Sequence, residues 1–229
     1  MTLLLNNSLD NVIGELQKDT ITTIFGPPGT GKSTICFQYL LKILALGKKV
    51  IYVDTEGGFS PERIAQLADF KVNYEDIIVF SPKSFEEQQK VVVDLNKAIK
   101  HSKDIGLVIV DSLVMLYRLK LGGAPQKINS ELGEQLRMLT QISRMYNIPI
   151  LVTNQMYTNF DTKENKMVGG TLIEYWSKTI IELQKEGDIK YILLKKHKFK
   201  PTSSKKEFEI TQSEGLVEKK FKFSLFRPN

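Results

Sequence analysis

The stretch GPPGTGKS, residues 26–33, constrains the fold more than any other part of this sequence. It has the spacing G-x-x-x-x-G-K-[ST] of a P-loop, which joins a strand to a helix. An apolar run, residues 21–25, precedes it, and an apolar-periodic segment, residues 35–46, follows it. The sequence therefore predicts a strand–loop–helix unit of an α/β fold. The alternative is an ordinary Gly/Pro turn, and the Lys-Ser pair in this context argues against it.

The residue types of this motif suit a nucleoside triphosphate. Glycine permits a tight turn, so that successive backbone N–H groups converge on phosphate at a helix N-terminus. Lys32 supplies charge for the β- and γ-phosphates and should be solvated when no nucleotide is bound. The Ser33 hydroxyl suits Mg²⁺, which prefers hard oxygen ligands. ATP and Mg²⁺ are the predicted cofactors, and the predicted nucleotide-binding residues are Gly26, Pro27, Pro28, Gly29, Thr30, Gly31, Lys32, Ser33 and Thr34.

Composition favours one domain in a reducing compartment. The chain has 229 residues, of which 41% are hydrophobic, enough for a sizeable core. We expect no membrane span and no secretory signal, because no apolar run is long enough and residues 1–9 have no basic start. Cys36, the single cysteine, is interpreted as a small core residue, which favours the cytoplasm. The net charge of +6 is compatible with a nucleic-acid partner.

Apolar strands alternate with amphipathic helices along most of the chain, which predicts a mainly parallel sheet. Strands are expected at 21–25, 49–54, 77–80, 106–111 and 148–153, and further helices at 60–70, from Ser84 onward and at 128–146. Residues 112–127 and 156–170 are expected to be loops. Segments 178–185, 189–196, 206–212 and 216–223 predict appended antiparallel strands. With no repeat or linker, residues 1–229 are expected to form a single domain.

Polar residues near the ends of three predicted strands are candidates for chemistry. Asp111 closes an apolar strand, as an aspartate that holds Mg²⁺ through water would, although any strand can end in aspartate. Glu56 follows another strand and would orient the attacking water, or would be a solvated loop glutamate. Gln155 would contact a γ-phosphate and report it to the adjoining loop, or would be a plain polar residue at the sheet edge.

A basic segment lies between Asp188 and Glu207, with seven lysines, His197 and no acidic residue. On a hairpin it would form an electropositive ridge, with alternate lysines on opposite faces. The alternative is a solvated basic face. Tyr175 and Trp176, which follow the second loop, are interpreted as core residues rather than base-stacking platforms.

Five motifs together resemble a known family. GPPGTGKS, VDTEGGFSPER at 53–63, LVIVDS at 107–112, VTNQ at 152–155 and GG at 169–170 have the order and spacing of the RecA/RadA recombinase core. Within that family the chain is similar to the archaeal RadB paralogues, which consist of an ATPase core with a basic Lys-His segment. The resemblance implies a RecA-like P-loop NTPase core that binds ATP, Mg²⁺ and DNA.

The resemblance also implies individual roles. Glu56 is similar to the catalytic glutamate, Arg63 to an arginine that stacks on adenine, Asp111 to the Mg²⁺ aspartate, and Gln155 to the γ-phosphate sensor, with Lys32 completing the catalytic set. The implied DNA contacts, in two loops and the basic segment, are Arg118, Lys120, Lys163, Lys166, Lys195, Lys196, His197 and Lys198.

Departures from RadA shape the expected function. About 20 residues precede the first strand, so we expect neither a helix-hairpin-helix domain nor the linker phenylalanine used in polymerisation. Residues 122–124 replace the usual Gly-Arg-Gly of the first loop, and the second loop is short. We expect an accessory protein of recombination and repair with slow ATP hydrolysis, partnered by DNA and a RadA-type recombinase. The alternatives are an ATP-switched binding module, a RecA-fold regulatory ATPase and a small-molecule kinase.

Overall fold

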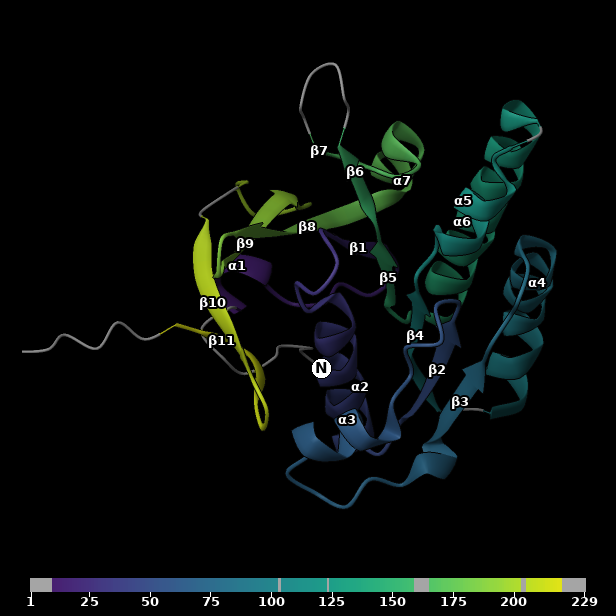
Figure 1. Ribbon diagram of the computed structural model, residues 1–229. Coiled ribbons are helices and arrows are strands. Elements are labelled where there is room, and N and C mark those ends of the chain that lie inside the picture. Colours follow the sequence, from purple (N-terminus) through teal and green to yellow (C-terminus); the bar gives the residue numbers. More distant parts are fainter. Residues whose placement is uncertain (1–9, 103, 123, 159–164, 203–204, 220–229) are drawn as a thin grey trace, which may run out of the picture.

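The computed structural model describes residues 10–102, 104–122, 124–158, 165–202 and 205–219. Nine of the described strands form one sheet in the order β11-β10-β9-β8-β1-β5-β4-β2-β3, with helices on both faces (Figure 1). The prediction of an α/β fold with a mainly parallel sheet and antiparallel C-terminal strands is confirmed.

The parallel strands are β1 (Ile21–Phe25), β2 (Lys49–Asp54), β3 (Ile77–Phe80), β4 (Ile105–Asp111) and β5 (Ile150–Asn154). The chain continues with β8 (Ser177–Glu186), which pairs parallel with β1, and with the antiparallel β9 (Ile189–Lys196), β10 (Lys206–Thr211) and β11 (Gly215–Glu218). The helices are α1 (Asp10–Ile13), α2 (Lys32–Ala45), α3 (Pro61–Leu67), α4 (Phe85–Ser102), α5 (Met115–Lys120), α6 (Pro125–Tyr146) and α7 (Gly170–Trp176), with a 3₁₀ turn at Tyr74–Asp76.

The central strands are apolar throughout because both faces of the sheet are covered. Successive side chains of a strand point to opposite faces. In β4, Val108 and Val110 join the core beneath α4 and α6, whereas Leu107 and Ile109 join the core beneath α2. The carboxyl ends of the parallel strands therefore remain at one edge of the sheet, where polar residues can gather.

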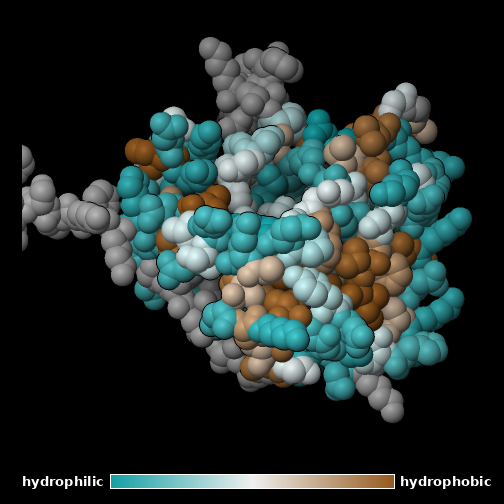
Figure 2. All heavy atoms as spheres, turned by 60° about the horizontal axis from the view of Figure 1, so that its bottom comes forward, coloured by the Kyte–Doolittle hydropathy of each residue, from teal (hydrophilic) through white to brown (hydrophobic). Residues whose placement is uncertain are grey.

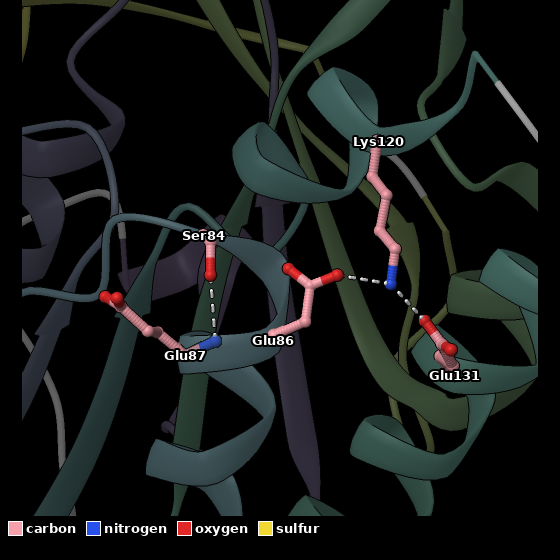
Figure 3. Close-up of polar contacts among 5 residues, drawn as sticks. All are labelled: Ser84, Glu86, Glu87, Lys120 and Glu131. Carbon is pink, nitrogen blue, oxygen red and sulfur yellow. Dashed lines mark hydrogen bonds and ion pairs between the residues drawn. The ribbon is translucent and has the colours of Figure 1, made fainter.

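Local capping signals in the sequence match the helix starts. Ser60 Oγ accepts the N–H of Arg63 at 3.1 Å, so α3 begins as predicted, although it ends at Leu67 rather than at residue 70. Ser84 Oγ likewise accepts the N–H of Glu87 at 3.1 Å at the start of α4 (Figure 3). The Glu87 carboxylate accepts the N–H of Lys83 at 2.7 Å, one residue earlier than a standard capping box would place it.

Two predicted loops contain regular structure. Residues 115–120 form α5 because Leu116 and Tyr117 give this short segment a buried face, and α6 already begins at Pro125, a favoured first helical residue. In the second loop β6 (Met156–Thr158) pairs with β7 (Asn165–Met167). Three residues are too few for a recognisable alternation, and this is why the sequence did not reveal the two strands. The predicted segment beyond residue 219 lies outside the described residues.

The outermost strand on one side of the sheet is β3, whose Val79 is 39% exposed. The space-filling view from the lower side of Figure 1, where β3 and α3 lie, shows hydrophobic residues gathered in a patch with a hydrophilic border (Figure 2). Within the described parts of the chain, no helix is long and apolar enough to cross a membrane.

Candidate nucleotide-binding site

The P-loop joins β1 to α2, and two of its glycines, Gly26 and Gly31, pack closely against the C-terminal strands. Gly31 has φ 95°, and a Cβ there would lie 2.8 Å from Ile210 Cδ1 and 2.9 Å from Leu216 Cδ1. A Cβ at Gly26 would lie 3.0 Å from the Cβ of Leu183 in β8. A Cβ at either position would force a neighbouring atom to move, so the side chains of β8, β10 and β11 restrict residues 26 and 31 of the loop to glycine.

Lys32 folds back onto the loop to which it belongs. Its ammonium donates to the carbonyl oxygens of Gly26 and Pro27, both at 2.9 Å. Burial lowers the pKa of Lys32, while the negative charges of Glu56 and Asp111 act in the opposite direction. The expectation that Lys32 would be solvated is therefore wrong, because the carbonyl groups of the loop bind the ammonium instead.

A cavity of about 360 Å³ opens beside the loop, within the size range of small-molecule sites. It brings residues from the P-loop and from the ends of β2 and β4 to one place. Its lining consists of Pro28, Gly29, Gly31, Lys32, Ser33, Thr34, Glu56, Asp111 and Ile210. Most of the predicted phosphate residues and the predicted Mg²⁺ and water-orienting residues thus share one opening. The predicted nucleotide-site residues that do not line it are Gly26, Pro27, Thr30, Arg63 and Gln155.

The strands on either side of β4 hold the Asp111 carboxylate. Its Oδ2 accepts the Tyr52 hydroxyl of β2 at 2.7 Å, and its Oδ1 accepts the hydroxyl of Thr153 in β5. Burial, followed by the charge of Asp111, raises the pKa of Tyr52, so the phenol remains a donor. Ser33 and Asp111 fit Mg²⁺, because both offer the hard oxygen ligands that this ion prefers.

Asp54 is a site residue that the sequence reasoning missed. Its buried carboxylate accepts four backbone N–H groups, from Glu56 at 3.2 Å, Gly57 at 2.8 Å, Gly58 at 3.1 Å and Phe59 at 3.0 Å. This arrangement fixes the turn that carries Glu56. The signal was available, since an aspartate followed within four residues by Gly-Gly is typical of a turn organised by its own side chain.

Gln155 connects the nucleotide cavity to α5. Its Nε2 donates to Glu56 Oε1 at 2.8 Å and lies 3.6 Å from the sulfur of Met115. Its Oε1 accepts a guanidinium N–H of Arg118. The amide therefore joins the candidate catalytic glutamate to a candidate DNA-binding arginine, and we call this chain of three side chains the Glu56–Gln155–Arg118 relay.

Arg63 and Gln38 attach the turn between β10 and β11 to the two helices nearest the P-loop. The Arg63 guanidinium donates to the carbonyl oxygens of Thr211 at 2.8 Å and Gln212 at 2.6 Å. Gln38 of α2 accepts the N–H of Leu216 at 3.2 Å. The structure thus places Arg63 against this turn, next to the strand whose Ile210 lines the cavity.

The family model described as Rad51 matches residues 5–218. The chain belongs to the Rad51 family. It is 41% identical over 212 residues to the DNA repair and recombination protein RadB of Methanosphaera stadtmanae, covering 90% of this chain and 91% of the relative. It is 41% identical over 221 residues to RadB of Methanobrevibacter smithii, covering 93% and 94%.

A solved structure described as the RadB recombinase has the same fold, with a TM-score of 0.78 at 32% identity, covering 95% of this chain and 100% of that one. The resemblance to archaeal RadB that the motifs indicated is therefore confirmed. The relatives named RadB are matched over nearly their whole length.

The basic residues of this Rad51-family chain differ in their partners. Lys120 forms ion pairs with Glu86 and Glu131, both at 2.8 Å (Figure 3). Its ammonium also lies 5.3 Å from the centre of the Phe85 ring. Its pKa is raised by hydrogen bonds to these two carboxylates. Lys195 pairs with Glu182 of β8 at 3.3 Å. For both lysines, a DNA phosphate would have to compete with a glutamate.

The other residues predicted to contact DNA have different partners or are exposed. Lys196 donates to the backbone oxygen of Glu174 at 2.5 Å, and Lys198 lies 5.0 Å from the centre of the Phe199 ring. His197 Nδ1 accepts two backbone N–H groups in the turn after β9, and burial lowers its pKa. Lys166 is exposed on β7, and Lys163 lies outside the described residues. The opposite orientations predicted for Lys195 and Lys196 agree with their contacts to β8 and α7.

Proposed function

We propose that this Rad51-family chain is an ATP-dependent DNA-binding protein of homologous recombination and repair. It hydrolyses ATP slowly and assists a recombinase rather than exchanging strands itself. Its relatives are named DNA repair and recombination proteins. The observation that carries the proposal is the Glu56–Gln155–Arg118 relay, since it joins the nucleotide cavity to a basic residue on the surface.

The ATP site follows from the cavity. Backbone N–H groups of the P-loop and Lys32 would bind the phosphates, and Ser33, with Asp111 acting through water, would hold Mg²⁺. The bound ion would neutralise charge that develops on the phosphates. Glu56 orients the attacking water, because Asp54 fixes its turn and Gln155 holds one of its oxygens. Arg63 would stack on the base beside the β10–β11 turn.

The relay explains how ATP could control DNA binding. The Gln155 amide has one oxygen, which accepts from Arg118, and one NH₂ group, which donates to Glu56. The second N–H of that group has only the weak acceptor of the Met115 sulfur, at 3.6 Å, so a γ-phosphate in the cavity would attract it and turn the amide. When the amide turns toward phosphate, Arg118 loses its acceptor and becomes available to DNA. In this mechanism Gln155 acts as the γ-phosphate sensor.

Contacts to DNA are proposed for Arg118, Lys166, Lys196, His197 and Lys198, together with Lys163 of the second loop. Lys120 and Lys195 contribute less, because each already has a carboxylate partner. Phosphate contacts of this kind give affinity without sequence preference. Nine of the described strands share one sheet, which supports treating residues 1–229 as one ATPase core domain. Its work on DNA would take place in the cytoplasm.

The test is the DNA affinity with and without ATP, measured on the wild type and on Gln155→Glu. Glutamate has nearly the same shape as glutamine but cannot donate to Glu56 or to phosphate. The wild type should bind DNA more tightly with ATP, and the variant should bind equally with and without it. Gln184→Ala is the control, because the Gln184 amide lies on β8 and donates to Glu182, which is not a member of the relay. A full ATP effect in Gln155→Glu would contradict the relay.

A RadA-type recombinase is the partner that we propose for the outer edge of β3. An edge strand offers backbone groups to a strand from another chain, and the hydrophobic patch of Figure 2 lies on this side. Val79→Lys should abolish binding to the recombinase. Leu46→Lys, at an exposed leucine just after α2, should have no effect. If Val79→Lys bound the recombinase as well as the wild type does, the outer edge of β3 would not be the binding site.

A further inference from the structure

Two exposed aromatic side chains lie on neighbouring segments near the end of β9. Tyr175 of α7 and Phe199 of the turn after β9 are each 70% exposed. The interpretation of Tyr175 as a core residue is therefore wrong, although Trp176 is partly buried against the core. Single exposed apolar residues are common on protein surfaces. These two differ from the common case because their surroundings hold them in place and add positive charge.

Hydrogen bonds fix the two segments. The Lys196 ammonium donates to the carbonyl oxygen of Glu174, which connects the end of β9 to α7. His197 Nδ1 accepts the N–H groups of Phe199 and Lys200, both at 3.0 Å, and so closes the turn. The rings that carry the exposed surface therefore stand on backbone that is already ordered, and binding a ligand there costs less conformational entropy.

Each exposed ring also has an aromatic neighbour. Tyr175 meets Trp176 edge to face, with ring centres 5.5 Å apart and planes at 90°. Phe199 meets His197 with ring centres 6.3 Å apart and planes at 65°. The neighbouring ring restricts the positions that each exposed ring can take, while most of its surface remains open to solvent.

The lysines beside the two exposed rings differ from other lysines of the basic segment, which form ion pairs with glutamates. Lys205 and Lys206 form ion pairs with Glu186 and Glu218. Within the parts of the chain that the structure describes, Lys196 and Lys198 instead have a carbonyl oxygen and an aromatic ring as partners. Both lysines are therefore able to bind a phosphate without giving up a carboxylate.

We propose that Tyr175 and Phe199 stack on the bases of single-stranded DNA while Lys196 and Lys198 bind its phosphates. Rings beside a cationic track are the chemistry by which proteins hold unpaired strands. In duplex DNA the bases already stack on each other inside the helix, so the rings have nothing to contact. This inference rests on the proposed DNA binding and adds to it the two rings, Tyr175 and Phe199, that would contact unpaired bases.

The experiment measures binding of a fluorescent oligo-dT strand, and of a duplex of equal length, over a range of salt concentrations. Tyr175→Ala and Phe199→Ala should each weaken binding to the single strand by roughly 5- to 150-fold. The slope of log affinity against log salt should not change, because no phosphate contact is lost. Binding to the duplex should also stay unchanged. Tyr175→Phe and Phe199→Tyr keep a ring and should retain affinity.

Two control variants separate this proposal from the proposed function. Phe70→Ala removes another exposed phenylalanine, between α3 and β3, and should leave the affinity for both DNA forms unchanged. Lys196→Ala combined with Lys198→Ala should weaken binding to both forms and reduce the salt slope by about one to two units. If this double variant changes nothing while Arg118→Ala also has no effect, the proposed DNA binding itself fails.

Three outcomes would overturn the stacking proposal while DNA binding stands. The alanine variants could leave single-strand affinity unchanged, or they could weaken single-strand and duplex binding equally. They could also change the mass of the protein in solution without changing DNA affinity, in which case the surface contacts protein. Circular dichroism of each variant shows whether it remains folded, and the conservative Phe and Tyr exchanges keep the test valid if an alanine variant unfolds.

Discussion

The nucleotide cavity and the basic segment between Asp188 and Glu207 both carry charge, but their charged side chains have different surroundings. At the cavity, Asp111 is 5% exposed and its oxygens are held by side chains of two neighbouring strands. In the basic segment the lysines lie nearer the surface, and three of the seven, Lys195, Lys205 and Lys206, each pair with a single glutamate. Buried, networked charges are strong and insensitive to salt, whereas exposed pairs are weak and screened. Substitutions should therefore have large effects at the cavity and small, salt-dependent effects on the segment.

The largest expected effect on catalysis comes from Glu56→Gln. The amide keeps an oxygen for Gln155 Nε2 but cannot act as a base toward water. ATP turnover should fall by about 10²- to 10⁴-fold while ATP affinity is retained. Turnover assays and nucleotide titrations check both parts, with Glu62→Gln, at an exposed residue of α3, as the control. If Glu56→Gln hydrolysed ATP at the wild-type rate, Glu56 would have no role in catalysis.

Asp54→Asn tests whether the turn beside the nucleotide cavity depends on the negative charge of the buried Asp54 carboxylate. Asparagine replaces one oxygen with an NH₂ group, which would face the N–H of Phe59 or its neighbours. Hydrogen bonds to a buried charge contribute about 1.5–3 kcal/mol, so thermal unfolding should shift down by several degrees. Turnover should also fall, because the turn carrying Glu56 loosens.

Asp76→Asn is the matched control, since the Asp76 carboxylate accepts no backbone N–H within the described residues: it makes a long ion pair with Lys49, at 3.9 Å, and accepts the side-chain amide of Asn73 at 2.9 Å. Its melting temperature and turnover should match the wild type. Equal melting temperatures for Asp54→Asn and Asp76→Asn would show that the Asp54 carboxylate does not organise the turn.

The sequence predicted the residues of the nucleotide cavity better than the contacts of the basic residues. The P-loop, Glu56 and Asp111 were predictable because motif spacing fixes them at strand ends, and the strands are fixed by their apolar pattern. The partners of the lysines were not predictable. Lys120 finds Glu86 and Glu131 on two other helices, and Lys195 finds Glu182 across a strand pair. A run without acidic residues says nothing about carboxylates that the fold brings in from elsewhere.

Arg118→Gln and Lys120→Gln compare an arginine with one neutral partner and a lysine with two acidic ones. They are only two residues apart in α5. Arg118→Gln should reduce the salt slope of DNA binding by about one unit, because one phosphate contact is lost. Lys120→Gln should leave the slope unchanged, since its charge is already matched by Glu86 and Glu131. Equal slopes in the two variants would mean that the ion pairs do not decide which residue meets DNA.

The smallest expected effect concerns pH. Burial, followed by the charge of Lys200, lowers the pKa of His197, so folding favours the neutral ring that accepts two N–H groups. The stability this adds is fully present above the ordinary pKa of about 6.5 and is lost as pH falls through the lowered value. When the pH falls from 7.5 to 5.5, the melting temperature of the wild type should drop further than that of His197→Asn, by an extra 2 °C at most, roughly. The asparagine oxygen accepts hydrogen bonds at any pH. An identical pH dependence of unfolding in both proteins would contradict the role of Nδ1.

The central claim is that the nucleotide cavity and the DNA surface are coupled through Gln155. Coupling between two binding sites is reciprocal, so DNA must change ATP affinity by the same factor by which ATP changes DNA affinity. The direct measurement is the ATP affinity of the wild type and of Gln155→Glu, each with and without saturating single-stranded DNA. We predict tighter ATP binding with DNA in the wild type and no difference in the variant. The same ATP affinity with and without DNA in the wild type would contradict the coupling.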